Sequence, residues 1–141
     1  MVVAAGHHKV GNPTPVIDVS TGTIWLPMLH QTGTGDEQKQ HGLDGVGTIE
    51  VWLSQSTDDA ATWTEPVDIT PQVHEPRADF IVIGPGVGIQ LQSGRLLIPS
   101  YFKTEWGDKT FTNAIWSKTT ARPGSTAKYV KKAPMNARQW S

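Results

Sequence analysis

Apolar and polar residues alternate in several short stretches of this chain, most clearly in the run from Thr48 to Ser54. There Ile49, Val51 and Leu53 share one side, and a period of two is typical of a half-buried β-strand. Similar runs predict strands at 15–18, 23–30, 48–55, 79–83, 88–92, 95–102 and 111–117, with a short further strand at Val67–Thr70. No window keeps a 3.6-residue apolar period, so the predicted fold class is all-β with antiparallel strands.

Turn signals separate these runs and arrange them in two units. Val19-Ser20-Thr21-Gly22 joins the first two predicted strands, and its glycine can take a left-handed conformation. Gln92-Ser93-Gly94 joins a later pair in the same way. Gln31 to Gly47 is rich in glycine and polar residues and is predicted to be a long loop. The strand pattern restarts near Asp79, which predicts a second, incomplete unit.

The stretch from Ser56 to Trp63 has the composition of a built turn between two strands. A carboxylate at its third position can accept hydrogen bonds from backbone N–H groups that a reversal leaves unpaired, and flanking hydroxyls can do the same. The final tryptophan is expected to pack its large apolar face on the sheet. If the backbone at Ala60 takes a positive φ, an alanine there would be strained, because only glycine takes this conformation readily.

This pattern, S-x-D-x-G-x-T-W, resembles the Asp box of sialidases and other β-propellers. The structural residues of the box are Ser56, Asp58, Thr62 and Trp63. The resemblance implies a scaffold turn on the rim, so we do not expect Asp58 to act as a catalytic acid.

Composition narrows the possible functions. The formal net charge of −1 argues against a general binder of nucleic acids or other polyanions. No cysteine is present, which excludes a disulfide framework and a thiol nucleophile. No apolar run is long enough to span a membrane, and the first ten residues lack the pattern of a signal peptide, so the sequence leaves the localisation unknown.

Three groups of residues have a chemical interpretation and a simpler one. The histidines could bind a metal, but they lack i,i+4 spacing, which favours surface or hydrogen-bonded histidines. The stretch Gly84–Gly88 has the glycines of a phosphate cradle, but its proline and the strand that follows favour close backbone packing. Asp36, Glu37 and Asp44 could supply a glycosidase carboxylate, or be solvated loop charges. No metal or other cofactor is therefore expected.

Three segments together resemble the exo-alpha-sialidase (neuraminidase) family: Gly11 to Asp18, the Asp box, and Gly84 to Tyr101. Their order and spacing agree with that family over roughly residues 11–117. The resemblance implies a six-bladed propeller of four-stranded antiparallel blades, of which this chain holds about two. It also implies removal of terminal sialic acid from glycoconjugates by an arginine clamp, an aspartic acid and a tyrosine nucleophile activated by a glutamate.

Most of the catalytic roles of this family find no matching position here, so no catalytic residue is assigned. Arg95 belongs to a hairpin and is not part of the arginine clamp. The resemblance places Asn12, Arg77 and Asp79 on the wall of the sugar pocket. We therefore expect a sialidase fragment that is inactive alone and self-associates through exposed blade edges. The alternative is a non-catalytic glycan-binding or adhesion propeller.

The C-terminal segment differs in character, because no acidic residue follows Asp108 while lysines and arginines continue. The family would place its next Asp box after Ser117. If one base were lost from the codon of Lys118, the shifted frame could encode Ser-Lys-Asp-Asp-Gly-x-Thr-Trp. Residues 1–117 are therefore interpreted as the partial propeller. Residues 118–141 are interpreted as a divergent basic tail that arises from a frameshift, with a natural tail as the alternative.

Overall fold

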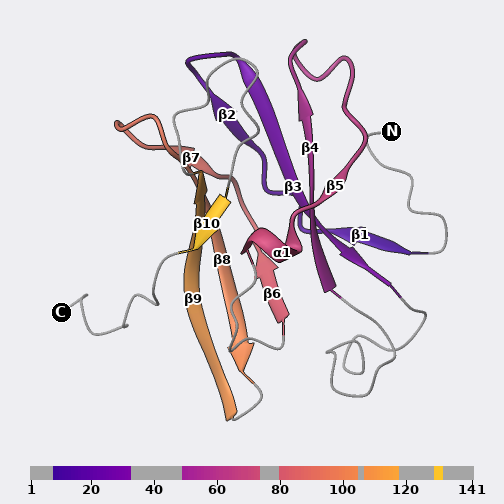
Figure 1. Ribbon diagram of the computed structural model, residues 1–141, viewed down its shortest axis with the longest axis vertical. Coiled ribbons are helices and arrows are strands. Elements are labelled where there is room, and N and C mark those ends of the chain that lie inside the picture. The colour runs from indigo at the N-terminus through magenta and orange to yellow at the C-terminus, as the bar shows by residue number, and fades with distance from the viewer. Residues whose placement is uncertain (1–7, 33–48, 74–79, 105–106, 118–128, 132–141) are drawn as a thin grey trace.

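The computed structural model describes residues 8–32, 49–73, 80–104, 107–117 and 129–131, and nearly all of them lie in or between β-strands (Figure 1). The first sheet contains β1 (Lys9–Gly11), β2 (Val16–Asp18), β3 (Thr23–Gln31), β4 (Ile49–Ser56) and β5 (Val67–Asp68). The second contains β6 (Phe80–Ile83), β7 (Ile89–Gln90), β8 (Leu96–Thr104), β9 (Gly107–Ser117) and β10 (Tyr129–Lys131). The predicted all-β class is confirmed, and each of the seven longer predicted strands overlaps an observed strand. The strand predicted at 88–92 is limited to β7, and the strand predicted at 111–117 begins earlier, at Gly107.

The two sheets repeat one topology. The first has the order β1-β3-β4-β5, with β2 also paired to β3, and the second has the order β6-β8-β9-β10, with β7 also paired to β8. All pairs are antiparallel. Pro27 lies opposite Leu53 in the first sheet, and Pro99 lies opposite Ala114 at the matching place in the second. Each sheet thus has the antiparallel order of a propeller blade, in which the first strand is broken into two short segments.

Glycines form both predicted hairpin turns. Gly22 has a φ of 73°, and its N–H donates to the Asp18 carbonyl at 2.8 Å. Gly94 has a φ of 80°, and its N–H donates to the Leu91 carbonyl at the same distance. A residue with a side chain rarely takes this conformation, so glycine at these positions sets where β3 and β8 begin.

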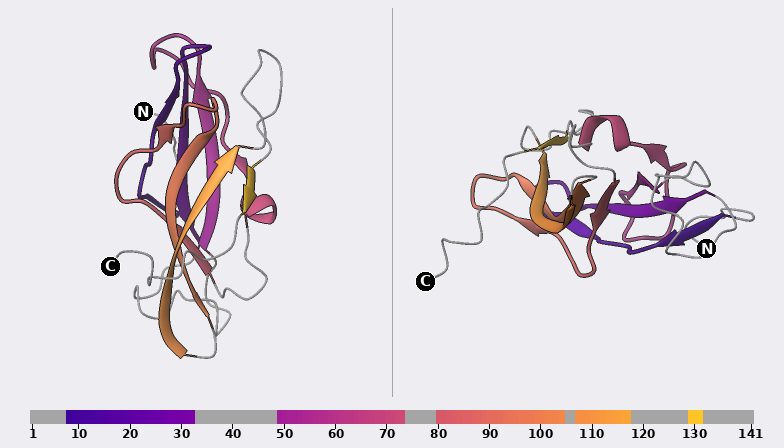
Figure 2. Two further views of the ribbon diagram at one scale, coloured as in Figure 1. Left: turned by 90° about the vertical axis from the view of Figure 1, so that its left-hand side faces the viewer. Right: turned by 90° about the horizontal axis from the view of Figure 1, so that it is seen from below.

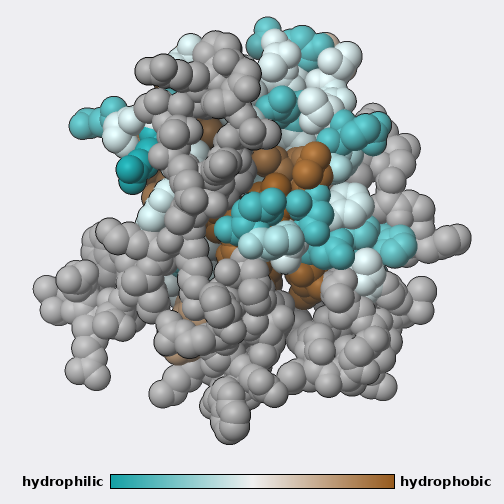
Figure 3. Space-filling model, viewed as in Figure 1, coloured by the Kyte–Doolittle hydropathy of each residue, from teal (hydrophilic) through white to brown (hydrophobic). Residues whose placement is uncertain are grey.

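The core lies between the two sheets, which Figure 2 shows from the side, and α1 (Thr70–Val73) packs beside β4 and β10 and buries Val73 in this core. Alternation places one side of β3 and β4 toward β6. The buried cluster consists of Val16, Trp25, Leu29, Val51, Ile69, Val73, Ile81, Val82, Ile83, Leu96, Ile98 and Ile115. The surface over the β4–β5 turn is hydrophilic, while apolar residues are visible near the middle of the same face (Figure 3).

Three details differ from the sequence predictions. The strand predicted at Val67–Thr70 ends at Asp68, because the Asp68 carboxylate accepts the Thr70 N–H at 2.8 Å and a short helix begins there. Strand β1 was not predicted from the sequence. Strand β10 gives the second unit an outer strand that the sequence did not predict, because main-chain pairing with β9 needs no particular side chain.

Several predictions lie outside the described residues. These are most of the loop Gln31–Gly47, and the C-terminal tail apart from β10. In the part of the chain that is described, no helix has the length and apolar character needed to cross a membrane.

Candidate functional site

The breaks in the two inner strands face each other and hold the sheets together. Asn12 has a φ of 48°, and its side-chain Nδ2 donates to the Ile83 carbonyl at 3.1 Å. The Thr14 hydroxyl donates to the Asn12 carbonyl at 3.1 Å, and the Gly88 N–H donates to the Pro15 carbonyl at 2.8 Å. Asparagine tolerates the left-handed region better than most residues, so this position suits it. Asn12 is therefore fixed both in its backbone and through one of its amide N–H groups.

The stretch Gly84–Gly88 allows close backbone packing, as the sequence predicted, and does not form an anion cradle. A Cβ on Gly88 would lie 2.7 Å from the Val16 Cβ and 2.9 Å from the Leu97 carbonyl oxygen. A Cβ on Gly84, which has a φ of 65°, would lie 2.6 Å from the Thr14 hydroxyl oxygen. Only glycine lets the two broken strands approach this closely.

A second polar contact between the sheets lies beside this break. Gln90 donates through Nε2 to the Asp18 carboxylate at 2.9 Å, and its Oε1 accepts the Val19 N–H at 2.9 Å. Asp18 is fully buried and also accepts hydrogen bonds from the backbone and side chain of Ser20. The carboxylate thus joins the first hairpin turn to the second sheet.

Of the three predicted pocket residues, only Asn12 lies within the described part of the chain. Arg77 and Asp79 lie outside the described residues, in the segment that precedes β6. The segment before β1 has the matching place in the first sheet, because Lys9 lies opposite Gln31 while Phe80 lies opposite Lys103. Asn12 follows β1, whereas Arg77 and Asp79 precede β6 in the sequence, so the pocket candidates do not come from matching ends of the two strands.

The Asp box forms the hydrogen-bonded turn that its residues predicted. The Asp58 carboxylate accepts the Thr62 N–H at 2.9 Å on Oδ1 and the Thr62 hydroxyl at 2.6 Å on Oδ2. The Ser56 hydroxyl donates to Asp58 Oδ1 at 2.8 Å and accepts the Ala60 N–H at 3.0 Å. These hydrogen bonds, those of Thr62 first, lower the pKa of Asp58 from 3.8 to about 2. The carboxylate is used within the turn, as a scaffold role requires.

The backbone at Ala60 has the positive φ that was expected to be strained for alanine. Its φ is 68°, and Asp59 beside it has a φ of 54°. An alanine at a left-handed position costs about 1–2 kcal/mol relative to its preferred conformation. Trp63 is partly buried and does not belong to the buried apolar cluster, so its packing on the preceding sheet stays a prediction.

We expect Asp58→Asn to make the stability of the chain less dependent on pH in acid. The folded-state pKa is lowered, so the ionised carboxylate contributes stability above its ordinary value near 3.8 and loses it as the pH falls through about 2. Urea midpoints of wild type and Asp58→Asn should therefore differ at pH 5 and converge toward pH 2. Asp59→Asn, which removes the neighbouring carboxylate, is the control, and an equal effect there would contradict the assignment.

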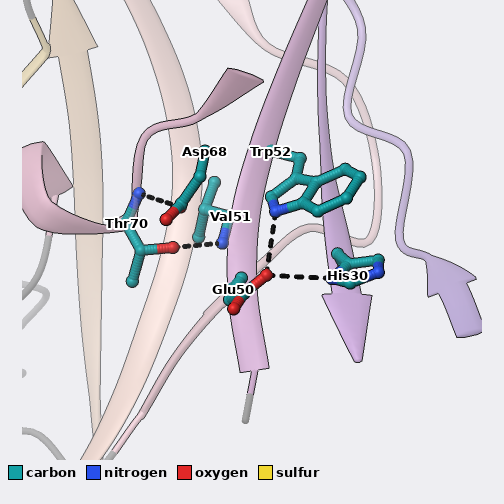
Figure 4. Close-up of polar contacts among 6 residues, drawn as sticks. All are labelled: His30, Glu50, Val51, Trp52, Asp68 and Thr70. Atoms are coloured by element: carbon teal, nitrogen blue, oxygen red, sulfur yellow. Dashed lines mark hydrogen bonds and ion pairs between the residues drawn. The ribbon is translucent and has the colours of Figure 1, made fainter. Parts of the chain in front are cut away.

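A cluster of rings lies at the opposite end of β3 and β4 from the Asp box (Figure 4). Glu50 Oε2 lies 2.9 Å from His30 Nδ1 and accepts the Trp52 indole N–H at 2.9 Å. The His30 and Trp52 rings stack with centroids 3.7 Å apart, and the His8 ring stacks on His30 at 5.0 Å. His30 is thus a hydrogen-bonded histidine, as the sequence favoured. Among the described residues, no group of three or more potential ligands could hold a metal ion.

Sequence reasoning did not identify this ring cluster as a unit. Glu50 and Trp52 are two residues apart in a strand, which places both on one face. That signal was present in the sequence, but His30 is 20 positions from Glu50. Only the register, in which His30 lies opposite Glu50, brings the ring and the carboxylate together.

Residues 1–133 match the BNR repeat-like domain family. Among curated proteins, the exo-alpha-sialidase of Arthroderma benhamiae is 38% identical over 125 residues, covering 82% of this chain and 31% of that protein. The sialidase of Bacteroides fragilis is 35% identical over 102 residues, covering 70% of this chain and 19% of that protein. The chain thus spans about a fifth to a third of the length of these relatives.

Solved structures agree with these relatives. The Hadza microbial sialidase Hz136 superposes with a TM-score of 0.76 at 30% identity, over 92% of this chain and 25% of that protein. The Trypanosoma rangeli sialidase superposes with a TM-score of 0.63 at 17% identity, over 90% of this chain and 22% of that protein, and supports the fold alone. The two sheets are therefore blades of a partial β-propeller of the BNR-repeat class. Within that class, the chain belongs to the exo-alpha-sialidase family.

Proposed function

We propose that this chain is part of an enzyme that hydrolyses terminal sialic acid from glycoconjugates. The observation that carries the proposal is the match to proteins named sialidase and exo-alpha-sialidase at 35% and 38% identity. The second support is the shared architecture with Hz136 at a TM-score of 0.76. Both likenesses extend over most of this chain and only a fraction of the relatives.

Within such an enzyme, this chain would form part of the wall of the sugar-binding pocket. Asn12, Arg77 and Asp79 are the substrate-binding candidates, with Asp79 as the acidic one. Asn12 is suited to this role because Ile83 and the left-handed backbone hold its side chain in place. One amide N–H is committed to Ile83, so the other donor and Oδ1 are the groups that could contact an N-acetyl or hydroxyl group of the sugar.

The alternative function, a non-catalytic glycan-binding or adhesion propeller, uses the same scaffold. The gene sequence on both sides of the coding region distinguishes the two. An arginine-containing motif upstream with a tyrosine and a glutamate downstream would favour the enzyme, and a gene that encodes none of them would favour binding.

The same gene sequence tests the frameshift proposal, which requires codon third bases of G, G, A and T, or nearly so, at Thr119, Thr120, Arg122 and Pro123.

We expect the purified chain to release no fluorophore from a fluorogenic sialoside above background. The arginine clamp and tyrosine nucleophile have no assigned position in these residues, and loss of such groups commonly lowers the rate by orders of magnitude. Turnover in the wild type that Asp79→Ala abolishes would contradict this. Sedimentation velocity on the same preparation tests self-association through exposed strands, where Ile17 of β2 and Ile89 of β7 are 54% and 52% exposed. A single monomeric species that melts sharply and reversibly would count against it.

A further inference from the structure

Each sheet has two faces, and only one face of each sheet is covered within the chain. We call the face that carries the central proline, Pro27 in the first sheet and Pro99 in the second, the proline face. The proline face of the first sheet carries Trp25 and Leu29, and the non-proline face of the second sheet carries Ile98. All three belong to the buried cluster, so the core forms where these two faces meet.

The two remaining faces carry apolar side chains that are incompletely covered. On the non-proline face of the first sheet, Ile17 is 54% exposed, and its strand partner Ile24 is half-buried. On the proline face of the second sheet, Ile89 is 52% exposed, and Leu97 and Trp116 are half-buried. These are the same two kinds of face that pack together in the core of the chain.

The repeated register shows which positions of the two sheets match. Ile17 of β2 and Gln90 of β7 each pair with the residue three positions before the proline of their sheet, so these two positions match. Asp18 and Leu91 follow them, and the carbonyl of each accepts the N–H of its turn glycine at 2.8 Å. Asp18 and Leu91 therefore match as well.

The contact between these positions is polar inside the chain and would be apolar between two copies. Within the chain, Gln90 of the second sheet donates to Asp18 of the first at 2.9 Å. The same geometry between copies would place Ile17 of one copy, which matches Gln90, against Leu91 of the other, which matches Asp18. Ile17 and Leu91 are 54% and 37% exposed. Their contact would therefore bury apolar surface without leaving a polar side chain unpaired.

A second contact follows from the same register. Val16 and Ile89 each pair with the residue two positions before the proline of their sheet, so they match, and the preceding residues Pro15 and Gly88 match as well. Gly88 packs against Val16 within the chain, where an added Cβ would lie 2.7 Å from the Val16 Cβ. The equivalent contact between copies joins Ile89 to Pro15, and both of these side chains are apolar.

We propose that copies of this chain associate head to tail, with the proline face of the second sheet of one copy packed on the non-proline face of the first sheet of the next. Because the two surfaces differ, the contact is heterologous, and repeated addition of copies closes a ring. Closed propellers contain four to eight blades, and three copies supply the six blades that the resemblance to sialidases implies. The contact depends on the fold and not on the proposed function, so either can fail without the other.

The direct test is a disulfide between copies, which is feasible because the chain contains no cysteine. An Ile17→Cys chain mixed with a tagged Leu91→Cys chain should form a mixed disulfide on mild oxidation. A Val67→Cys chain, changed at a 61% exposed residue of β5, should not form one with the same partner. Sedimentation velocity of the wild type should show a species of three chain masses. A monomer at all concentrations, or the absence of the mixed disulfide between positions 17 and 91, would overturn the proposal.

Charged variants separate this contact from association through strand edges. Ile17→Asp and Leu91→Asp should each raise the Kd for self-association about a hundredfold, as expected for an unpaired charge in an apolar contact. The double variant Ile17→Lys/Leu91→Asp places opposite charges against each other at every contact and should recover part of the affinity. Val67→Asp, on the outer edge of the first sheet, should leave the Kd unchanged. If Val67→Asp weakens association and Ile17→Asp does not, with both folded by their amide spectra, the copies meet at strand edges and the proposal fails.

Discussion

Replacing Gly88 with alanine is expected to destabilise the chain by about 2–3 kcal/mol, the upper part of the range for overpacking a well-packed site. The new methyl group would lie 2.7 Å from the Val16 Cβ and 2.9 Å from a backbone carbonyl oxygen of Leu97. Neither neighbour is the end of a flexible side chain, so relief requires the two sheets to separate locally. Urea unfolding followed by tryptophan fluorescence measures the change.

The matched control is Gly11→Ala, in the other broken strand. A Cβ on Gly11 would have no neighbour within 4 Å, so this variant should change the free energy of unfolding by less than about 0.5 kcal/mol. Equal urea midpoints for the two variants would show that the close contact between the two broken strands does not require glycine at position 88.

Replacing Ile83 with alanine is expected to cost about 3–4 kcal/mol, within the range for truncating a fully buried isoleucine. Ile83 has no exposed surface and belongs to the cluster that joins the two sheets. Its carbonyl also accepts a hydrogen bond from the Asn12 side chain, so collapse of the cavity left by the truncation would also displace Asn12. The same urea measurement applies, with the Asn12 backbone NMR signal as a local reporter.

Ile89→Ala is the control for this second variant, since Ile89 is 52% exposed on β7. The same chemical deletion there should cost less than about 1 kcal/mol, because part of its surface is already in water. If Ile89→Ala destabilised as much as Ile83→Ala, the core would not lie where the two sheets meet.

Side-chain periodicity was enough to predict where the strands lie, but not all of their ends. The run that became β4 alternates over seven residues, and the runs that became β3 and β8 are apolar stretches bounded by turn signals, so the existence and type of these strands followed from the sequence. Val67–Thr70 was wrong beyond Asp68, because a single side-chain hydrogen bond from the Thr70 N–H begins a helix there. β1 was missed because its three residues are too few to show a period.

The candidate site likewise has parts that could be predicted from the sequence and parts that could not. The Asp box was predictable because Ser56, Asp58 and Thr62 interact within seven residues of chain, and their hydrogen bonds are as expected. The packing role of Gly84–Gly88 was also predictable from its glycines and proline. The bond from Asn12 to Ile83 was not, since it joins residues 71 positions apart.

The sequence alone determined the class of fold, the two hairpin turns and the scaffold turn, because each depends on neighbouring residues and on a period that the chain itself displays. The tertiary structure alone decided which distant groups meet. Strand register set His30 against Glu50 and its counterpart Phe102 against Phe111, and a one-residue shift would have moved these side chains to the other face. The contact between residues 12–15 and 84–88 likewise exists only because two broken strands from different units pack together. Packing between segments so far apart in the sequence leaves no pattern in either segment by itself.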